Sequence, residues 1–155
     1  MLYAASRAGA DLALRSNRGV QFRYPTLDLT DSSSIERLAK TIKDEDGKVD
    51  VLFNVAGLNI AKPQSGPRAF PDNKKIMDVN FQGTLQMCVT FLPLIKPGGR
   101  IVNLSSVASS LRSYSEGLQA RFRDPKMTLS ALQALVTEYE VRKVLIKPMR
   151  ETDDH

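Results

Sequence analysis

The chain has 155 residues, a formal net charge of +5 at pH 7 and a single cysteine, Cys88. A chain of this length forms at most one domain, its apolar runs are too short for a membrane span, and its first residues lack the pattern of a secretory signal, so we expect a cytoplasmic protein that keeps its one thiol reduced. Basic residues are dispersed among acidic ones, which argues against a nucleic-acid partner, and one His with one Cys supplies no metal site.

The first part of the chain is predicted to contain two strands. Residues 2–6 are apolar and end at Ser6, which indicates a strand. Residues 8–15 are rich in Ala and Leu, which favours a short helix. Residues 20–29 alternate between apolar and polar types and predict a second strand, which finishes at Asp28.

A helix start signal follows. The polar residues from Asp31 to Ser34 offer several N-caps, and Ser33 with Glu36 fits a capping box. Apolar residues then recur at the spacing of one helix face, namely Ile35, Leu38, Ala39 and Ile42. We expect this helix to end at Gly47.

Residues 49–57 are the most informative stretch. The run is apolar with β-branched and aromatic types, which predicts a strand buried on both faces of a parallel sheet. It ends at Ala56 and Gly57, small residues that let a ligand approach the backbone. Asn54 is the polar exception, and a buried amide needs hydrogen-bond partners, so we expect it to tie neighbouring strands or loops together. The run therefore predicts a central strand whose carboxyl end opens onto a small-molecule site.

The remaining segments continue the alternation of helix and strand. The predicted elements are a loop over 58–71, a helix over 72–92, a strand over 100–104 that ends at Ser105-Ser106, helices over 115–123 and 128–143, and a polar tail over 147–155. We expect residues 1–146 to form one domain.

Strands that alternate with helices predict an α/β fold with a parallel sheet. Ligands in such sheets bind outside the carboxyl ends of the strands. The predicted strands end in small or polar residues, namely Ser6-Arg7, Asp28, Asn54 to Gly57, and Ser105-Ser106. Parallel strands bring these ends to one edge, so we predict a single site there.

Several motifs, in the same order along the chain, resemble those of the short-chain dehydrogenase/reductase family. They are Asp28-Leu29, Asn54-Val55-Ala56-Gly57, Val79-Asn80-Phe81-Gln82-Gly83 and Gly99-Arg100-Ile101-Val102-Asn103-Leu104-Ser105-Ser106. Residues 116–123 are similar to a helical insertion in the NADPH-dependent carbonyl reductase branch. The resemblance implies a Rossmann-like, doubly wound parallel sheet, NADP(H) as cofactor, and hydride transfer to a small-molecule ketone or aldehyde.

The resemblance implies roles for residues at the adenosine end of the cofactor. Arg7 would face the 2′-phosphate, which a guanidinium binds through charge-assisted bonds; the alternative is a solvated arginine at a strand end. Asp28 would accept from the adenine amino group while Leu29 packs on the ring; the alternative is an Asp that forms a turn.

The resemblance places other residues along the cofactor and the substrate. Asn54, Ala56 and Gly57 would lie along the riboses, although Val55 stands where the family usually has a second Asn. Asn80 would hold a water of the proton relay, and the alternative is an Asn bonded to a backbone carbonyl.

A catalytic serine is implied by the same resemblance. Ser106, the second serine of its pair, would hydrogen-bond the substrate carbonyl oxygen as charge develops there. The alternative is a cap in a Ser-rich turn, since Ser105, Ser109 and Ser110 lie nearby.

The sequence departs from the family pattern in three places: the opening strand with its turn, the tyrosine–lysine pair, and the downstream part with the last strands, the helices that cover one sheet face and the substrate loop. The opening strand and its Gly-rich turn do not precede residue 2; in the family this strand lies between the strands that match residues 2–6 and 49–55, so its absence would leave two sheet edges unpaired. Tyr139 and Lys143 give a literal Tyr-x-x-x-Lys, but they lie in the predicted insertion helix, so we interpret Tyr139 as a packed helix residue.

We therefore expect a partial Rossmann-like sheet without the first strand and the C-terminal strands. The expected function is that of an inactive or weakly active fragment of a carbonyl reductase. The alternative is a non-catalytic nucleotide-binding remnant, or one that self-associates through its unpaired sheet edges.

Overall fold

A computed structural model describes residues 1–10, 13, 19–58, 73–106 and 109–141. The chain divides into two compact units, Met1–Leu104 and Ser105–His155. No helix among the described residues is long and apolar enough to cross a membrane.

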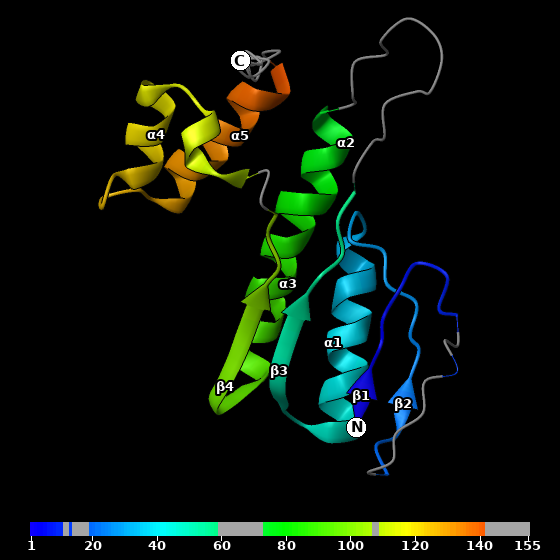
Figure 1. The fold of residues 1–155 in the computed structure, drawn as a ribbon. Coiled ribbons are helices and arrows are strands. Elements are labelled where there is room, and N and C mark those ends of the chain that lie inside the picture. Colours follow the sequence, from blue (N-terminus) through cyan, green and yellow to red (C-terminus); the bar gives the residue numbers. More distant parts are fainter. Residues whose placement is uncertain (11–12, 14–18, 59–72, 107–108, 142–155) are drawn as a thin grey trace, which may run out of the picture. The chain divides into compact units, whose positions relative to one another are not determined.

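The first unit contains two parallel two-stranded sheets. β1 (Leu2–Tyr3) pairs with β2 (Phe22–Arg23), and β3 (Val49–Asn54) pairs with β4 (Ile95–Asn103). The four arrows point in one direction, with β1 and β3 as the inner strands (Figure 1). This arrangement confirms the predicted parallel α/β fold.

The pairing of the first two strands continues past their short regular parts. Ser6 and Thr26 form an isolated parallel bridge, and the Ser6 N–H donates to the Pro25 carbonyl oxygen over 3.2 Å. Regular ladder geometry stops early on this side, because Pro25 has no N–H to donate. The predicted strands over 2–6 and 20–29 are therefore present but shorter than expected.

The helix predicted over residues 8–15 is wrong where the structure describes it. Residues 7 and 8 form a turn that the Gly9 N–H closes by donating to the Ser6 carbonyl oxygen, and residues 9 and 10 are not helical. Gly9 has a φ of 58°, and a Cβ there would lie 2.6 Å from Thr26 Oγ1. The turn thus folds the chain tightly against the second strand. Residues 11–12 and 14–15 lie outside the described residues.

Helix α1 (Ser32–Asp46) follows its prediction closely. Asp31 is the N-cap and accepts from the Ser33 N–H, so the cap is one of the residues we considered, whereas the Ser33–Glu36 box does not form. Gly47, with a φ of 76°, ends the helix as expected. The predicted apolar face is buried, namely Ile35, Leu38, Ala39 and Ile42.

The helix predicted over 72–92 is interrupted by a change in hydrogen-bond pattern. α2 (Asn73–Met77) passes into a π-helical segment, η1 (Asp78–Gly83), and then into α3 (Thr84–Phe91), which ends in the 3₁₀ turn η2 (Leu92–Leu94). Single π turns inside α-helices are frequent at functional sites. Here the π turn holds Asn80, one of the predicted site residues.

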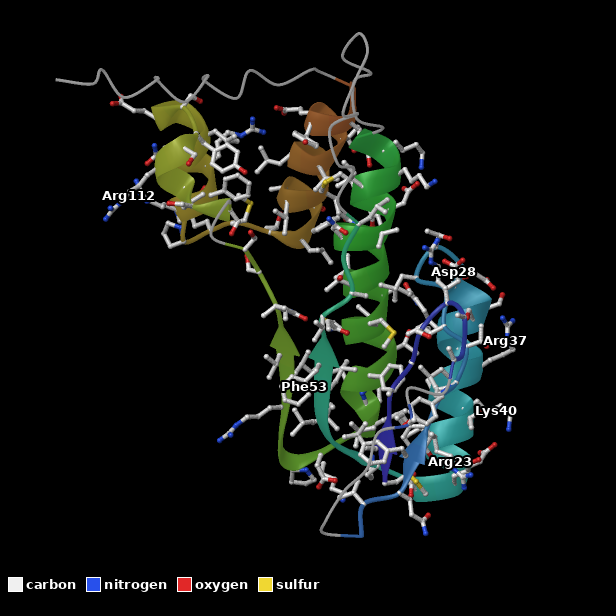
Figure 2. The ribbon with its side chains drawn as sticks, turned by 45° about the vertical axis from the view of Figure 1, so that its right-hand side comes forward. Arg23, Asp28, Arg37, Lys40, Phe53 and Arg112 are labelled. Carbon is white, nitrogen blue, oxygen red and sulfur yellow. The ribbon has the colours of Figure 1, made fainter. Side chains whose placement is uncertain are left out.

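The core of the first unit lies between α1, α3 and one face of β3–β4. Its buried apolar side chains are Ile35, Leu38, Ala39, Ile42, Met87, Phe91 and Leu94. Arg37 and Lys40 lie on the side of α1 that faces away from β3 (Figure 2). The amphipathic helices therefore cover one side of the sheet.

The expectation that β3 is buried on both faces is wrong. Phe53 is 65% exposed, and it pairs with Val102 on the side of the sheet opposite to α3. The exposed apolar side chains of this face are Val51, Phe53, Val55, Val102 and Leu104. The apolar run made β3 suitable for burial on both faces. This face is exposed because none of the described helices of the first unit covers it.

The second unit contains the predicted helices. Its described elements are η4 (Leu111–Ser113), α4 (Glu116–Arg123) and α5 (Leu129–Val141). Leu135 and Val136 are buried, and Arg121 binds both carboxylate oxygens of Glu138, at 2.8 and 2.9 Å. The polar tail over 147–155 lies outside the described residues.

Candidate functional site

The carboxyl ends of the strands of the first unit lie at one edge. β1, β2, β3 and β4 run in the same direction (Figure 1), so the residues that follow them emerge on the same side. A cavity of about 630 Å³ extends along β1 and β3 to this edge. The predicted cofactor residues Leu29, Asn54 and Ala56 line it, together with Ala5 and Leu27, which the sequence did not single out.

Asp28 is held at the end of the second strand by a local turn. Its Oδ1 accepts from the Thr30 N–H at 2.8 Å and from Thr30 Oγ1 at 2.7 Å, and its own N–H donates to Ser34 Oγ at 3.0 Å. The hydrogen bonds from Thr30, with a smaller attraction from Arg7, hold the pKa of the Asp28 carboxyl below its usual value of 3.8.

Asp28 and Arg7 are predicted site residues that follow two neighbouring strands, and the charge of Arg7 contributes to lowering the pKa of the Asp28 carboxyl. Asp28 lies beside the start of α1 (Figure 2), and Arg7 follows the first strand. The turn expected as the alternative role of Asp28 does form, because Thr30 closes it. A carboxylate has about four acceptor positions, so the two bonds from Thr30 leave acceptor capacity on this group.

Asn54 ties β3 to β4, as predicted. Its amide nitrogen donates to Asn103 Oδ1 at 2.8 Å and to Cys88 Sγ at 3.5 Å. The Cys88 thiol in turn donates to Asn103 Oδ1 at 3.6 Å. The contact of Cys88 with the two amides depends on how α3 is rotated about its axis against the sheet, which the sequence does not show.

The Asn80 side chain forms two hydrogen bonds with the backbone that follows β3. Its Oδ1 accepts from the Leu58 N–H at 2.6 Å, and its Nδ2 donates to the Leu58 carbonyl oxygen at 2.9 Å. A Cβ on Gly57 would lie 3.6 Å from Asn80 Oδ1, so Gly57 and Asn80 are neighbours. The backbone contact expected as the alternative role of Asn80 is therefore present, and it brings two predicted site residues together.

Ser106 belongs to the second unit. Its carbonyl oxygen accepts from the Ser109 N–H at 3.0 Å, and Ser105 Oγ lies 2.8 Å from Ser109 Oγ. The placement of Ser106 beside the substrate stays a prediction.

Tyr139 lies in α5 of the second unit and is half-buried. It belongs to the apolar stripe of this helix, in agreement with its interpretation as a packed residue. Lys143, the other half of the literal Tyr-x-x-x-Lys, lies outside the described residues.

The arrangement of the first unit defines a class of fold. Parallel strands, crossover helices and a cavity that reaches their carboxyl ends are the features of a Rossmann-like α/β domain, here in a partial form. A family profile described as short chain dehydrogenase matches residues 2–118. The chain belongs to the short-chain dehydrogenase family.

Individual relatives agree with this assignment. Carbonyl reductase [NADPH] 1 from Homo sapiens is 40% identical over 124 residues, which make up 78% of this chain and 44% of the relative. The protein of the same name from Bos taurus is 37% identical over 124 residues, with the same two coverages. The chain therefore spans less than half the length of these curated relatives. Their names confirm the predicted resemblance to the carbonyl reductase branch.

A solved structure supports the fold. Menthone neomenthol reductase from Mentha piperita aligns with a TM-score of 0.75 at 24% identity, over 89% of this chain and 63% of that chain. At this identity the likeness shows the fold alone. It confirms the partial Rossmann-like architecture predicted from the sequence.

Proposed function

We propose that this chain carries the adenosine side of an NADP(H) site, in a protein that reduces a ketone or an aldehyde. The supporting observation is that Leu29, Asn54 and Ala56 line one cavity at the carboxyl ends of the strands, while Arg7 and Asp28 follow two strands that pair with each other. The name of the human relative, Carbonyl reductase [NADPH] 1, supports both the cofactor and the substrate class.

The residues at the adenosine end have chemistry that fits the cofactor. Arg7 offers a planar set of donors that matches a 2′-phosphate. Asp28 stays ionised, because Thr30 and Arg7 stabilise its charged form, and an ionised carboxylate accepts from an adenine amino group. Leu29 supplies apolar surface for the ring.

The residues at and after the end of β3 fit the riboses of the cofactor, and Asn80 and Ser106 fit the end where hydride transfer takes place. Asn54, Ala56 and Gly57 leave a narrow, small-residue surface along which two riboses fit. Bound NADPH supplies the hydride. In this proposal Asn80 positions a water, and Ser106 donates a hydrogen bond to the substrate carbonyl oxygen as negative charge develops on it.

We expect negligible reductase turnover from these 155 residues alone. The Gly-rich turn and the tyrosine–lysine pair of the family have no counterparts at the matching positions, and each such element contributes about 10² or more to the rate. NADPH-dependent turnover that Ser106→Ala abolishes would contradict this expectation.

Titration calorimetry with two nucleotides tests the binding proposal. Adenosine 2′,5′-bisphosphate carries the phosphate that Arg7 would bind, and adenosine 5′-monophosphate lacks it. Arg7→Ala should weaken the binding of the bisphosphate about 10- to 100-fold, the factor for charge-assisted hydrogen bonds. It should leave the affinity for the monophosphate unchanged. The control is Arg112→Ala, which removes the same charge from the second unit. It should change the affinity for neither nucleotide. Equal losses for both nucleotides, or no binding by the unaltered chain, would reject the proposal.

A second candidate function is self-association. The exposed apolar face of β3–β4, together with the unpaired strand edges in the described part of the first unit, offers surface that another copy would cover. Light scattering over a range of protein concentrations tests it. A mass that rises with concentration supports this function, and a constant monomer mass rejects it.

A further inference from the structure

The end of α1 contains Asp46-Gly47, the one Asp-Gly pair in the sequence. Gly47 has a φ of 76° and a ψ of −49°, and the Lys48 N–H donates to the Asp46 carbonyl oxygen at 2.8 Å. These values describe a γ-turn of the strained type, which residues with a side chain rarely adopt. Opening of the backbone at this point therefore releases strain.

An Asp-Gly pair is chemically reactive because glycine leaves its backbone nitrogen accessible; a Cβ on Gly47 would meet no atom within 4 Å. The Gly47 nitrogen can attack Cγ of Asp46, which forms a C–N bond, releases one water and closes a five-membered succinimide. Water then opens this ring. Where it cleaves the bond between the nitrogen and the main-chain carbonyl carbon of residue 46, the chain continues through the former side chain as isoaspartate. The reaction needs no other reactant.

The fold restrains the attacking nitrogen. The Gly47 N–H donates to the carbonyl oxygens of Ile42 and Lys43, both at 3.1 Å. Asp46 is the last residue of α1, and ring closure requires rotation about its Cα–C bond, away from the helical ψ of about −42°. The last helical turn must therefore open before the nitrogen reaches the side chain.

Tyr3 of β1 restrains the other reacting group. Its hydroxyl lies 2.6 Å from Asp46 Oδ2 and 2.7 Å from Glu45 Oε2, and β1 lies beside the end of α1 (Figure 1). A phenol has one hydrogen to donate, so the two carboxylates share it. Arg23 Nε lies 4.0 Å from Glu45 Oε2 and attracts that carboxylate as well. Glu45 therefore competes with Asp46 for the hydroxyl and has a second partner of its own.

We propose that Asp46-Gly47 is an isoaspartate-forming site, restrained by the Tyr3 hydroxyl and by the end of α1. The reaction proceeds through local opening of the last turn of α1, without unfolding of the whole first unit. Such local openings need less free energy than global unfolding, and helix ends open readily. The proposal does not depend on nucleotide binding.

The modification would alter the contacts that restrain it. Isoaspartate adds one carbon to the main chain, which displaces Gly47 from the carbonyl oxygens of Ile42 and Lys43. Its carboxylate is attached directly to Cα, one carbon closer to the backbone than the side-chain carboxylate of Asp46. Tyr3 then loses the partner through which it links β1 to α1. Isoaspartate formation therefore weakens the connection between this strand and this helix.

Peptide mapping of the full chain tests the proposal. The protein is incubated at neutral pH and digested with trypsin, and chromatography separates the aspartate and isoaspartate forms of the peptide of residues 44–48. The chain unfolded in guanidinium chloride should react at least about fivefold faster than the folded chain, the factor for one hydrogen bond of about 1 kcal/mol. Asp46→Glu should show no reaction, because its ring closure would need a less favourable six-membered ring.

A pair of variants isolates the Tyr3 hydroxyl. Tyr3→Phe removes the donor, and it should speed isoaspartate formation in the folded chain about two- to tenfold, the factor for a hydrogen bond of about 0.5–1.5 kcal/mol. Glu45→Ala removes the competing acceptor and leaves the hydroxyl hydrogen to Asp46, so it should not speed the reaction. Circular dichroism checks that both variants are folded.

Two further measurements separate local opening from global unfolding. Gly83→Ala destabilises the first unit through the contact with Leu29 and retains the Tyr3 contact, so it should change the rate by less than about twofold. In the unaltered chain, the rate should vary little with guanidinium concentration below the unfolding transition, because a local opening exposes little surface.

Several results would overturn the proposal. Equal rates in the folded and the unfolded chain would show that the fold does not restrain the site, and no isoaspartate in the unfolded chain would show that the site is unreactive. A Tyr3→Phe rate that does not exceed the rates of the unaltered chain and of Glu45→Ala would exclude the role of the hydroxyl. A rate that follows global unfolding, in Gly83→Ala or in guanidinium, would exclude local opening.

Discussion

The side-chain amide of Asn54 donates to Asn103 Oδ1 over 2.8 Å and joins β3 to β4 where both strands end. Cys88 of α3 contacts both amides, so the pair lies on the helix-covered side of the sheet. This contact fixes the point from which residues 55–57 leave the sheet, and hence the part of the site assigned to the cofactor riboses.

We expect Asn54 and Asn103 to be energetically coupled. In a double-mutant cycle of Asn54→Ala and Asn103→Ala, measured by urea unfolding, the coupling should be about 0.5–1.5 kcal/mol, the range for one hydrogen bond. Asp50 and Lys96 also link β3 to β4, at 2.9 Å, but their side chains are 76% and 45% exposed. Their cycle should give about 0.5 kcal/mol or less, because water screens the pair. A smaller coupling for the Asn pair than for the ion pair would contradict this ranking.

Gly83 permits a close approach between the helix that carries Asn80 and the start of the cofactor site. A Cβ there would lie 2.7 Å from both Leu29 Cβ and the Leu29 carbonyl oxygen. Gly83→Ala should therefore destabilise the first unit by about 1–3 kcal/mol in denaturant unfolding. Gly57→Ala is the matched control, since its Cβ meets only Asn80 Oδ1 at 3.6 Å; it should change stability by less than about 0.5 kcal/mol. Equal losses would show that Gly83 and Leu29 are not tightly packed.

The elements that the sequence predicted well have strong local signals. Asp31 and Gly47 bound α1 because a side-chain cap and a positive φ are local requirements. The buried stripe of α1 follows from helix geometry alone. By contrast, the apolar run of β3 indicated burial on both faces, and Phe53 is exposed, because composition does not show which elements are present to cover each side.

In the candidate site, too, the sequence predicted features that depend on local signals and missed those that depend on how elements pack together. Asn54 was expected to tie strands together because a polar side chain in an apolar run needs a partner. That the partners would be Asn103 and Cys88 depends on the register of β3 with β4 and the phase of α3. The contact of Asn80 with Leu58 depends on the π turn of η1, for which the periodicity of residues 72–92 gave no signal.

The two hydrogen bonds between Asn80 and Leu58 predict a local effect on exchange. In Asn80→Ala, the Leu58 amide loses its acceptor, and its hydrogen-exchange rate should rise about five- to tenfold, the factor for roughly 1–1.4 kcal/mol. Asn80→Asp keeps an oxygen acceptor for this N–H and should retain most of the protection. Unchanged exchange in Asn80→Ala would mean that other groups protect this amide.

Tyr3 links β1 to the last turn of α1. Its hydroxyl lies 2.7 Å from Glu45 Oε2 and 2.6 Å from Asp46 Oδ2. Burial, followed by hydrogen bonds and repulsion from Asp46 and Glu45, raises the pKa of the Tyr3 hydroxyl well above its ordinary value of 10.0. The folded chain therefore keeps this hydroxyl neutral over a wider pH range than the unfolded chain does.

This shift predicts how stability depends on pH. The contribution of Tyr3 is complete below the unfolded-state pKa of 10.0, and it is lost as pH rises above that value, because only the unfolded chain then releases the proton readily. At pH 7, Tyr3→Phe should cost about 0.5–1.5 kcal/mol in urea unfolding through the lost hydrogen bonds. The difference between the two proteins should shrink from pH 10 to pH 11. A difference that stays constant or grows over this range would show that the hydroxyl is not held neutral by Asp46 and Glu45.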